Sequence, residues 1–145
     1  MRRARFAAAL LAAIALPVAA AEFKSAAAPA ISYDSPSERG RKVSIIRPGT
    51  PLEVIVGLDQ WLKVRDVTGA INWVERRLLA DRRTVLVSVP RLVVRTEPAN
   101  DAPARFEAVK DVVLELVEAP RFGWIQVRHP DGDAGYARAI EVWGL

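Results

Sequence analysis

The chain has 145 residues, with 21 lysines and arginines, 17 aspartates and glutamates and no cysteine. The lack of cysteine excludes disulfide bonds, thiol catalysis and thiolate metal sites. Arg2, Arg3 and Arg5 lie in a segment that we expect to be removed, which leaves 18 basic against 17 acidic residues, a formal net charge of +1 in place of +4. The remaining chain lacks the clustered basic charge that nucleic-acid binding needs, so we expect no nucleic-acid partner.

Residues 1–21 have the organisation of a secretory signal peptide. Arginines open the segment, an apolar run extends from Phe6 to Leu16, and Ala19, Ala20 and Ala21 supply the small residues that signal peptidase needs. The run is shorter than the roughly 20 residues that span a bilayer, and no cysteine follows it to carry a lipid. We expect cleavage before Glu22, a periplasmic or secreted protein, and no stable membrane anchor after cleavage.

The rest of the chain reads as a series of short strands. After an Ala-rich start and the turn-forming stretch DSPSERGRK come β-branched or alternating runs separated by Pro-Gly, Thr-Gly, Phe-Gly and Asp-Gly: VSII, PLEVIV, WLKVRDV, INWV, TVLVSV, RLVV, VVLELVEA, WIQVRH and AGYA. This spacing predicts a small all-β barrel or sandwich. The one competing helical stretch is VERRLLADRR, residues 74–83, where we expect at most one short helical turn.

An internal repeat divides the chain into two similar units. Trp61, Val64, Arg65 and Gly69 recur 63 residues later as Trp124, Val127, Arg128 and Gly132, and Tyr136 occupies the position that answers Trp73. Pro36, Leu52 and Glu53 recur after 62 residues as Pro98, Leu114 and Glu115. The offset rises from 62 to 63 residues before Trp124, so we expect a one-residue insertion in the loop sequence APRFG. The repeat predicts a duplicated barrel, with domains at residues 22–82 and 83–145.

Alternation within the repeated strand WLKVRDV places Trp61, Lys63, Arg65 and Val67 on one face and Leu62, Val64 and Asp66 on the other, so neither face is purely apolar. Trp61 is therefore expected at a barrel rim. The glycines Gly69 and Gly132 fit hairpin turns that need positive φ. A unit of about sixty residues is marginally stable alone. We therefore expect the two units to pack together, with residues 84–94 as a shared wall and no flexible linker between them.

The repeated text resembles the bacterial SH3 (SH3b) superfamily, and within it exported proteins with two tandem SH3-like domains and no enzyme attached. The matching text is RPGTPLEVIVGLDQWLKVRDVTGAINWVERRLLADRRTVLV in the first unit, with VRTEP and VLELVEAPRFGWIQVRHPDGDAGYARAIEVWG in the second. The family's usual Gly-Trp-Val strand reads NWV and GYA here. The resemblance implies a five-stranded, strongly bent barrel and, in better understood relatives, attachment to cell-wall peptidoglycan or to proteins that work on it.

Catalytic and metal chemistry find little support in the residues. His129 is the single histidine, and its place in the turn HPDG is typical of a solvated side chain rather than a catalytic base. Asp131 and Asp133 flank Gly132, but the other positions of a calcium loop are absent, so we expect turn capping and no metal. We predict a protein that is not an enzyme and has no cofactor. Arg65 and Arg128 either pair with wall carboxylates or form surface ion pairs.

Six aromatic residues are the candidates for ligand binding, since an SH3-like barrel can place aromatic faces along a groove that holds a peptide or sugar. They are Tyr33, Trp61, Trp73, Phe122, Trp124 and Tyr136. The alternative is a core position, above all for Trp73 and Tyr136. The sequence predicts an exported binding module for peptidoglycan peptides or for a cell-wall enzyme. A structural envelope protein that binds only a protein partner is the alternative function.

Overall fold

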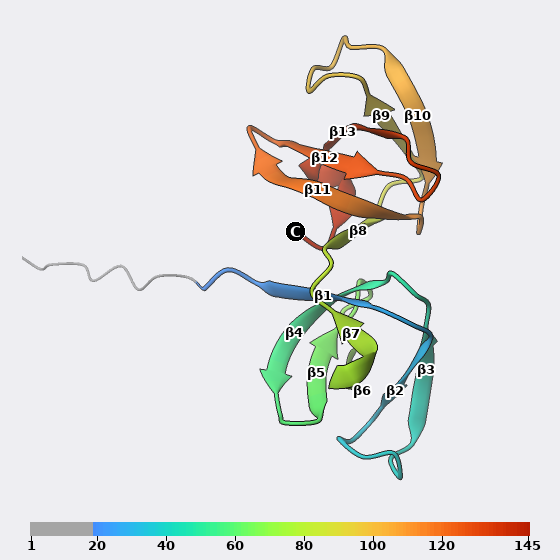
Figure 1. Cartoon of the computed structure of the whole chain (residues 1–145), viewed down its shortest axis with the longest axis vertical. Helices are drawn as coiled ribbons and strands as arrows, with labels where there is room; N and C mark the ends of the chain where they lie inside the picture. The colour runs from blue at the N-terminus through green and yellow to red at the C-terminus, as the bar shows by residue number, and fades with distance from the viewer. Residues whose placement is uncertain (1–18) are drawn as a thin grey trace, which may run out of the picture.

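The computed structural model describes residues 19–145, which form two all-β domains that follow one another along the long axis of the molecule (Figure 1). The predicted signal peptide, residues 1–21, lies outside the described residues except for its last three. No helix in residues 19–145 is long and apolar enough to cross a membrane. The predicted all-β fold with two tandem SH3-like domains is confirmed.

Seven strands build the first domain. They are β1 (Glu22–Ala26), β2 (Ala30–Tyr33), β3 (Lys42–Ile46), β4 (Pro51–Gly57), β5 (Trp61–Arg65), β6 (Ile71–Glu75) and β7 (Leu79–Ala80). They pair antiparallel in the order β3-β2-β6-β5-β4-β1-β7. The predicted short helical turn is confirmed as the 3₁₀ turn η1 (Arg76–Leu78).

The second domain repeats this arrangement strand for strand. Its elements are β8 (Thr84–Val87), β9 (Arg91–Arg95), β10 (Ala104–Val109), β11 (Val113–Arg121), β12 (Trp124–Arg128), β13 (Ala134–Arg138), the 3₁₀ turn η2 (Ala139–Glu141) and β14 (Val142–Trp143). The order β10-β9-β13-β12-β11-β8-β14 is the first order shifted by seven strands, as a duplication predicts. Each domain has two strands more than the five that the resemblance implies. In each domain, three residues divide the opening strand into two strands, and a two-residue strand follows the 3₁₀ turn. These two features account for the two additional strands.

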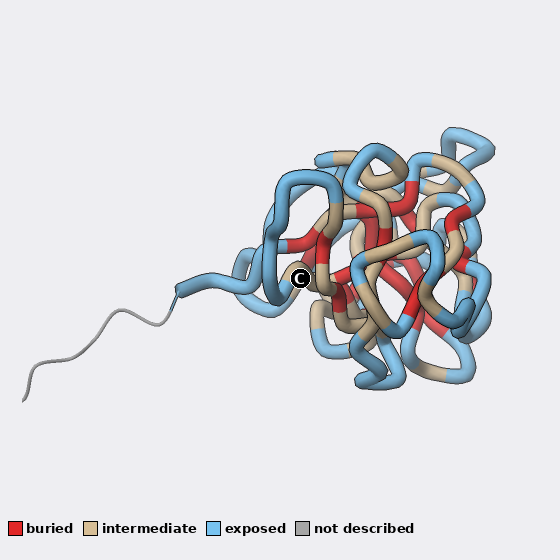
Figure 2. The backbone as a smooth tube through the Cα atoms, turned by 90° about the horizontal axis from the view of Figure 1, so that it is seen from below, coloured by how far each residue is buried: buried red, intermediate tan, exposed pale blue. Residues whose placement is uncertain are grey.

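Alternation along the strands fixes what is buried. In β5, Leu62 and Val64 are buried while Trp61, Lys63 and Arg65 are half-buried, as predicted, and β12 repeats this pattern. The buried segments lie inside, and exposed segments lie on the outside (Figure 2). Each domain has a core cluster of its own: Ala26, Ala30, Ile46, Leu52, Leu62, Val64 and Val74 in the first, and Val85, Val87, Leu92, Val94, Ala108, Leu114, Ile125, Val127, Ala137 and Val142 in the second.

Turn residues behave as the repeat predicts. Gly69 has φ +87° and Gly132 has φ +103°, which are conformations that side chains with a Cβ rarely adopt. The inserted residue also falls where expected. Strand β11 has nine residues against seven in β4, while the hairpin loop that follows it is one residue shorter.

The two domains pack through the first strand of each. The ring of Phe23 in β1 contacts Trp143 in β14 edge-on, with centroids 5.2 Å apart, and the Arg83 guanidinium lies 5.5 Å from the Phe23 ring. The Thr84 hydroxyl donates a hydrogen bond to the carbonyl of Gly49 at 2.6 Å. The three residues between β7 and β8 are held as well, because Ser25 Oγ donates to the Arg82 carbonyl and Arg83 Nη2 donates to the Gly144 carbonyl.

The prediction of a shared wall is correct for β8 and wrong for β9. In β8, Val85 and Val87 belong to the second core, while Leu86 lines a pocket of the first domain. In β9, Leu92 and Val94 are fully buried in the second core. A strand can present only one of its two faces to each side, and β9 lies too far along the sheet to reach the first domain.

Replacing Phe23 by alanine tests how strongly the domains support one another. We expect Phe23→Ala to lower the free energy of unfolding by about 3 kcal/mol, because it removes a buried ring and its contact with Trp143. We also expect the wild type to unfold in a single thermal transition and Phe23→Ala to unfold in two. Differential scanning calorimetry would record the difference. The matched control is Phe122→Ala, whose ring is 93% exposed and should leave stability within about 0.5 kcal/mol. Equal losses from both variants would contradict the role of Phe23.

Candidate functional site

The six predicted aromatic side chains form two groups, one on each domain. Phe122, Trp124 and Tyr136 together line a pocket of about 360 Å³ on the second domain. The remaining three, Tyr33, Trp61 and Trp73, lie on strands β2, β5 and β6 of the first domain. Trp61 and Trp73 are at the repeat positions of Trp124 and Tyr136, whereas Tyr33 and Phe122 occupy different places in the two domains.

Strands β12 and β13 position the second-domain group. Trp124 pairs with Arg138, and Gln126 pairs with Tyr136, so these four side chains share one face of the sheet. The residues that alternate with them are buried in the core. Because the opposite face of the same strands is fixed by the core, the aromatic face has a rigid support.

Phe122 occupies the tip of the hairpin between β11 and β12. Its φ is +50°, followed by +81° at Gly123, and two successive positive φ values are typical of a tight two-residue hairpin turn. The ring is 93% exposed and lies 5.9 Å from the Arg121 guanidinium. A non-glycine residue seldom adopts positive φ, and a fully exposed phenylalanine gains nothing from burial. Both features mark Phe122 as a candidate contact for a partner.

Cations surround the other side of Trp124. The Arg138 guanidinium lies 5.1 Å from the Trp124 ring and donates a hydrogen bond to Asn100 Oδ1 at 2.9 Å. A second hollow, of about 280 Å³, is lined by Trp124 together with Arg91, Arg95, Arg138 and one acidic residue, Glu141. The Trp124 ring lines both hollows. In the second hollow, Arg91 pairs with Glu107, and Arg95 donates to the Ala102 carbonyl.

The aromatic residues of the first domain are more engaged with one another. Tyr33 is 6% exposed and contacts Trp61 edge-on, with ring centroids 5.5 Å apart. The Lys63 ammonium lies 5.7 Å from the Trp73 ring. Trp61 also lines a hollow of about 470 Å³ whose charged residues are Glu38, Arg39, Glu75 and Arg77. Acidic Glu75 stands here at the repeat position of Arg138, so the two aromatic faces differ in charge.

The alternative that Trp73 and Tyr136 belong to the core is wrong. Both are half-buried, and the buried residues beside them are Val74 and Ala137, each 0% exposed. Successive side chains of a strand point to opposite faces, so a buried Val74 places Trp73 on the outer face. The predicted rim position of Trp61 holds, since it is half-buried at the first residue of β5.

The repeated arginines form surface ion pairs. Arg65 Nη1 lies 2.8 Å from Glu53 Oε2, and Arg128 Nη1 lies 3.6 Å from Glu115 Oε2 at the equivalent place. Arg82 also donates to Glu115 Oε2, at 2.9 Å. Each arginine thus has a partner on the neighbouring strand, and the ion-pair interpretation describes both.

The turn HPDG is closed by its own side chains. The Asp133 N–H donates to Asp131 Oδ1 at 2.9 Å, and the His129 imidazole lies 3.0 Å from the Asp131 carboxylate. The predicted capping by Asp131 is confirmed. No three histidine, aspartate or glutamate side chains among the described residues lie close enough to hold a metal ion.

Two features of the site were missed by the sequence predictions. Arg138 was not predicted as a site residue. The repeat places it at the position of Glu75, and this difference in charge is present in the sequence. Phe23 and Trp143 were not singled out either. They lie 120 residues apart and have Val85 and Ala80 at their repeat positions, so no pattern in the sequence connects them.

Two small antiparallel barrels in tandem, each with an aromatic outer face, define a class of protein built from SH3-like binding modules. The sequence matches the family "Bacterial SH3 domain" twice, over residues 26–81 and 88–144. The chain therefore belongs to the bacterial SH3 domain family, with two copies of the domain.

Two solved structures resemble the chain at low sequence identity. The chain is similar to NlpC1 and NlpC2 from Trichomonas vaginalis, each with 12% identity and with TM-scores of 0.40 and 0.38. These matches cover 94% and 86% of this chain, which spans only about half the length of the two structures, 50% and 48%. No curated protein matches the sequence.

Acid titration of Asp131 tests the closure of the HPDG turn. The Asp133 N–H, and then the neighbouring His129, hold the pKa of Asp131 below its ordinary value of 3.8. A lowered pKa means that the ionised carboxylate supports the turn fully above about pH 4, and that this support is lost as the pH falls through the lowered value. Carbon-detected NMR of the Asp131 carboxyl should give a midpoint below 3.8, and His129→Gln should raise it. A wild-type midpoint at or above 3.8 would contradict the assigned hydrogen bonds.

Proposed function

We propose that this protein is a non-catalytic binding module of the cell envelope that recognises the peptide part of peptidoglycan. The observation that carries the proposal is the shared pocket of Phe122, Trp124 and Tyr136 on the second domain. Aromatic faces hold an extended peptide by stacking and apolar contact, while nearby polar groups select it. The proposal rests also on the family membership and on the predicted signal peptide, which leads the chain out of the cytoplasm.

Charge supports a peptide that carries carboxylates. Arg138 lies against one side of Trp124, and Arg121 lies beside Phe122. Guanidinium groups bind carboxylates with paired hydrogen bonds, whereas sugars offer no charge to them. The peptide stems of peptidoglycan bear free carboxylates, so they fit this pocket better than the glycan strands do.

The second domain is the better candidate of the two. In the first domain, Tyr33 is buried against Trp61, and Lys63 lies beside Trp73, so much of each ring is already in contact. In the second domain, Phe122 is exposed and the pocket beside Trp124 is open to a ligand. A rigid and exposed aromatic pair contributes most to binding when it is desolvated by the ligand.

A protein partner in the envelope is the second candidate, and a different observation favours it. Seven of the eleven exposed large apolar side chains in residues 19–145 belong to the first domain: Ile45 at 79%, with Val43, Ile55, Val56, Leu58, Val67 and Ile71 less exposed. Exposed apolar side chains in such number are typical of surfaces that bind other proteins. A cell-wall enzyme docked there is compatible with a second domain that binds the wall.

Co-sedimentation with purified, protein-free sacculi tests the proposed function. We expect the wild-type protein to pellet. Trp124→Ala should weaken binding by at least about 2 kcal/mol, roughly thirtyfold, because it removes the ring at the centre of the site. Phe122→Ala should weaken binding as well, with folding verified by circular dichroism for each variant.

The matched control is Trp61→Ala, which makes the same chemical change at the equivalent position of the first domain. We expect a folded Trp61→Ala variant to pellet like the wild type. If folded Trp124→Ala pellets undiminished, the second-domain pocket is not the site. If the wild type itself stays in solution, wall binding is wrong, and crosslinking in cells should then identify a protein partner at the exposed apolar residues of the first domain.

A further inference from the structure

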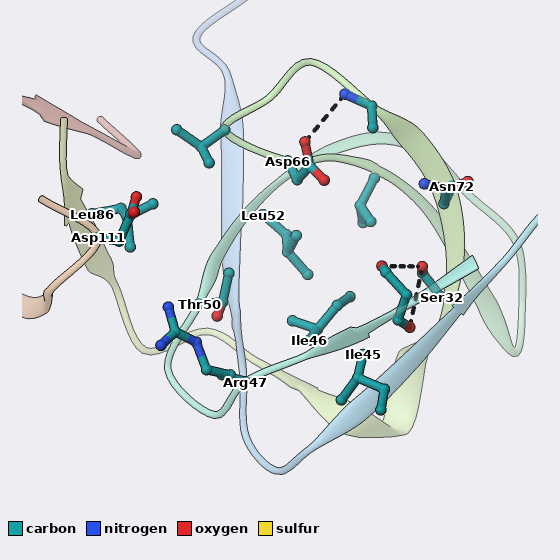
Figure 3. A pocket seen from close by; sticks show the side chains of 14 residues that line it. Ser32, Ile45, Ile46, Arg47, Thr50, Leu52, Asp66, Asn72, Leu86 and Asp111 are labelled. Atoms are coloured by element: carbon teal, nitrogen blue, oxygen red, sulfur yellow. Dashed lines mark hydrogen bonds between the residues drawn. The ribbon is translucent and has the colours of Figure 1, made fainter. Parts of the chain in front are cut away.

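The first domain opens into its own core through a pocket of about 270 Å³. Leu52 and Val64, which are 1% and 2% exposed, belong to the core cluster and also line this pocket. Strands β2, β3 and β6 contribute polar residues to its wall, and Leu86 and Asp111 of the second domain complete it (Figure 3). The pocket lies in the other domain from the aromatic site proposed above.

The second domain shows what fills this space elsewhere in the repeat. Ser32 pairs with Ser44 across β2 and β3, and the equivalent pair across β9 and β10 is Val94 with Phe106. Val94 is fully buried and Phe106 packs against the second core. Two serines thus stand where a valine and a phenylalanine fill the other barrel. Ile46, larger than its counterpart Ala108, recovers only part of the lost volume.

A third exchange adds an amide to the pocket wall. Asn72 in β6 stands at the position of Gly135 in β13. A Cβ at Gly135 would lie 2.5 Å from the carbonyl oxygen of Arg95, so the second domain has no space for a side chain there. The first domain therefore differs from the second in the spacing of its backbone as well as in its side chains. The wider backbone spacing beside Asn72 thus adds space to the pocket of the first domain, in addition to the space left by the smaller serine side chains.

Hydrogen bonding leaves part of the polar wall available. The hydroxyls of Ser32 and Ser44 lie 2.7 Å apart and bond to each other. Asp66 Oδ1 accepts hydrogen bonds from the backbone of Thr68 and Ala70, which closes its turn, and Oδ2 has no hydrogen bond within residues 19–145. The Asn72 amide has no side-chain hydrogen bond to another of the residues that the structure describes. Asn72 is not among the side chains of this part of the chain with a buried, unpartnered polar atom, so its amide is open to solvent and available to hydrogen-bond a ligand.

Charges of both signs stand at the pocket. Arg47, Asp66 and Asp111 line it, and none of the three forms an ion pair within residues 19–145. In Figure 3, Ser32 and Asn72 lie on one side, Arg47 and Asp111 lie on the other, and Leu52 and Ile46 lie between them. A ligand that fits must be small, have an apolar middle, and carry groups that satisfy an amide, a cation and a carboxylate.

We propose that this pocket binds a short zwitterionic peptide with small apolar side chains, of dipeptide size. Its methyl groups would contact Leu52 and Val64, and its peptide bond would meet the Asn72 amide. Its carboxylate would pair with Arg47, and its ammonium would pair with Asp66 or Asp111. A purely anionic ligand would face two carboxylates. The inference does not depend on the second-domain site.

Titration of the purified protein with alanyl-alanine, followed by backbone amide NMR, tests the proposal. We expect saturable shifts at residues 44–47 and 64–72 with a dissociation constant in the millimolar range, as a ligand of this size allows. The same dipeptide with acetylated and amidated ends should bind at least about tenfold more weakly, since it lacks both charges. No saturable shift up to the solubility of the dipeptide, or equal binding of the blocked form, would overturn the proposal.

Two variants copy the second domain into the first. Ser44→Phe should fill the pocket and abolish the shifts, and Ser32→Val, which changes the volume less, should weaken binding if Ser44→Phe does not fold. Arg47→Gln should weaken binding at least about fivefold, whereas Arg105→Gln, an exposed arginine of β10, should not. Trp124→Ala should leave dipeptide binding unchanged, which separates this site from the wall-binding site. A folded Ser44→Phe variant that binds like the wild type would exclude the pocket.

Discussion

A small antiparallel barrel has room inside for one side chain in two along each strand, and the remaining side chains must lie outside. In β5 and β12 the inner positions are Leu62 with Val64 and Ile125 with Val127. The cores of both domains are built from such residues, and they hold the strands in a single register, because a slip by one residue would expose them all. Every candidate site residue on these strands owes its position to that register.

The residues at the outer positions can therefore vary, and comparison of the two domains shows how much they differ. Glu75 and Arg138 are equivalent, as are Asp66 and His129, yet each pair differs in charge. The turn after β5 and the turn after β12 close with the same backbone hydrogen bond, from residue 66 to 70 and from 129 to 133. One backbone therefore presents an aromatic face flanked by charges of both signs in the first domain and by arginine in the second.

Exchange within the core follows a different physical rule. An outer residue can change without cost to packing, but an inner one leaves a void or needs a larger neighbour. Ser32 and Ser44 stand at the positions of Val94 and Phe106, and the hydroxyls satisfy each other instead of contacting apolar atoms. The first domain therefore gives up packing that the second retains. Its contacts with β8 and with Trp143 compensate for part of that loss.

Much of the fold could be predicted from the sequence, because alternation and the repeat both constrain strands. The strand WLKVRDV, its inner and outer faces, the turns at Gly69 and Gly132 and the inserted residue before Trp124 are all local patterns. The position of Trp73 was harder. In INWV both Asn72 and Val74 lie on one face, and only the burial of Val74 shows that this face is the inner one. The phase of a short strand with mixed faces is decided by its neighbours rather than by its own residues.

The remaining features depend on contacts between segments that no periodicity links. Phe23 meets Trp143 because β1 and β14 lie at the junction, and the residues at their repeat positions are neither aromatic nor in contact with each other. The pocket of the first domain depends on which residues face each other across β2 and β3, a register that the turn DSPSERGRK does not define.

The pocket of the first domain is completed by residues of the second domain. Leu86 and Asp111 of the second domain line the pocket of the first, while β8 carries the second core on its other face. A ligand held in that pocket would contact both domains and so favour the arrangement in which they are packed. Two domains that are marginal alone would then be stabilised together by whatever the first one binds. The duplication thus provides two different surfaces on a pair of barrels that neither would support by itself.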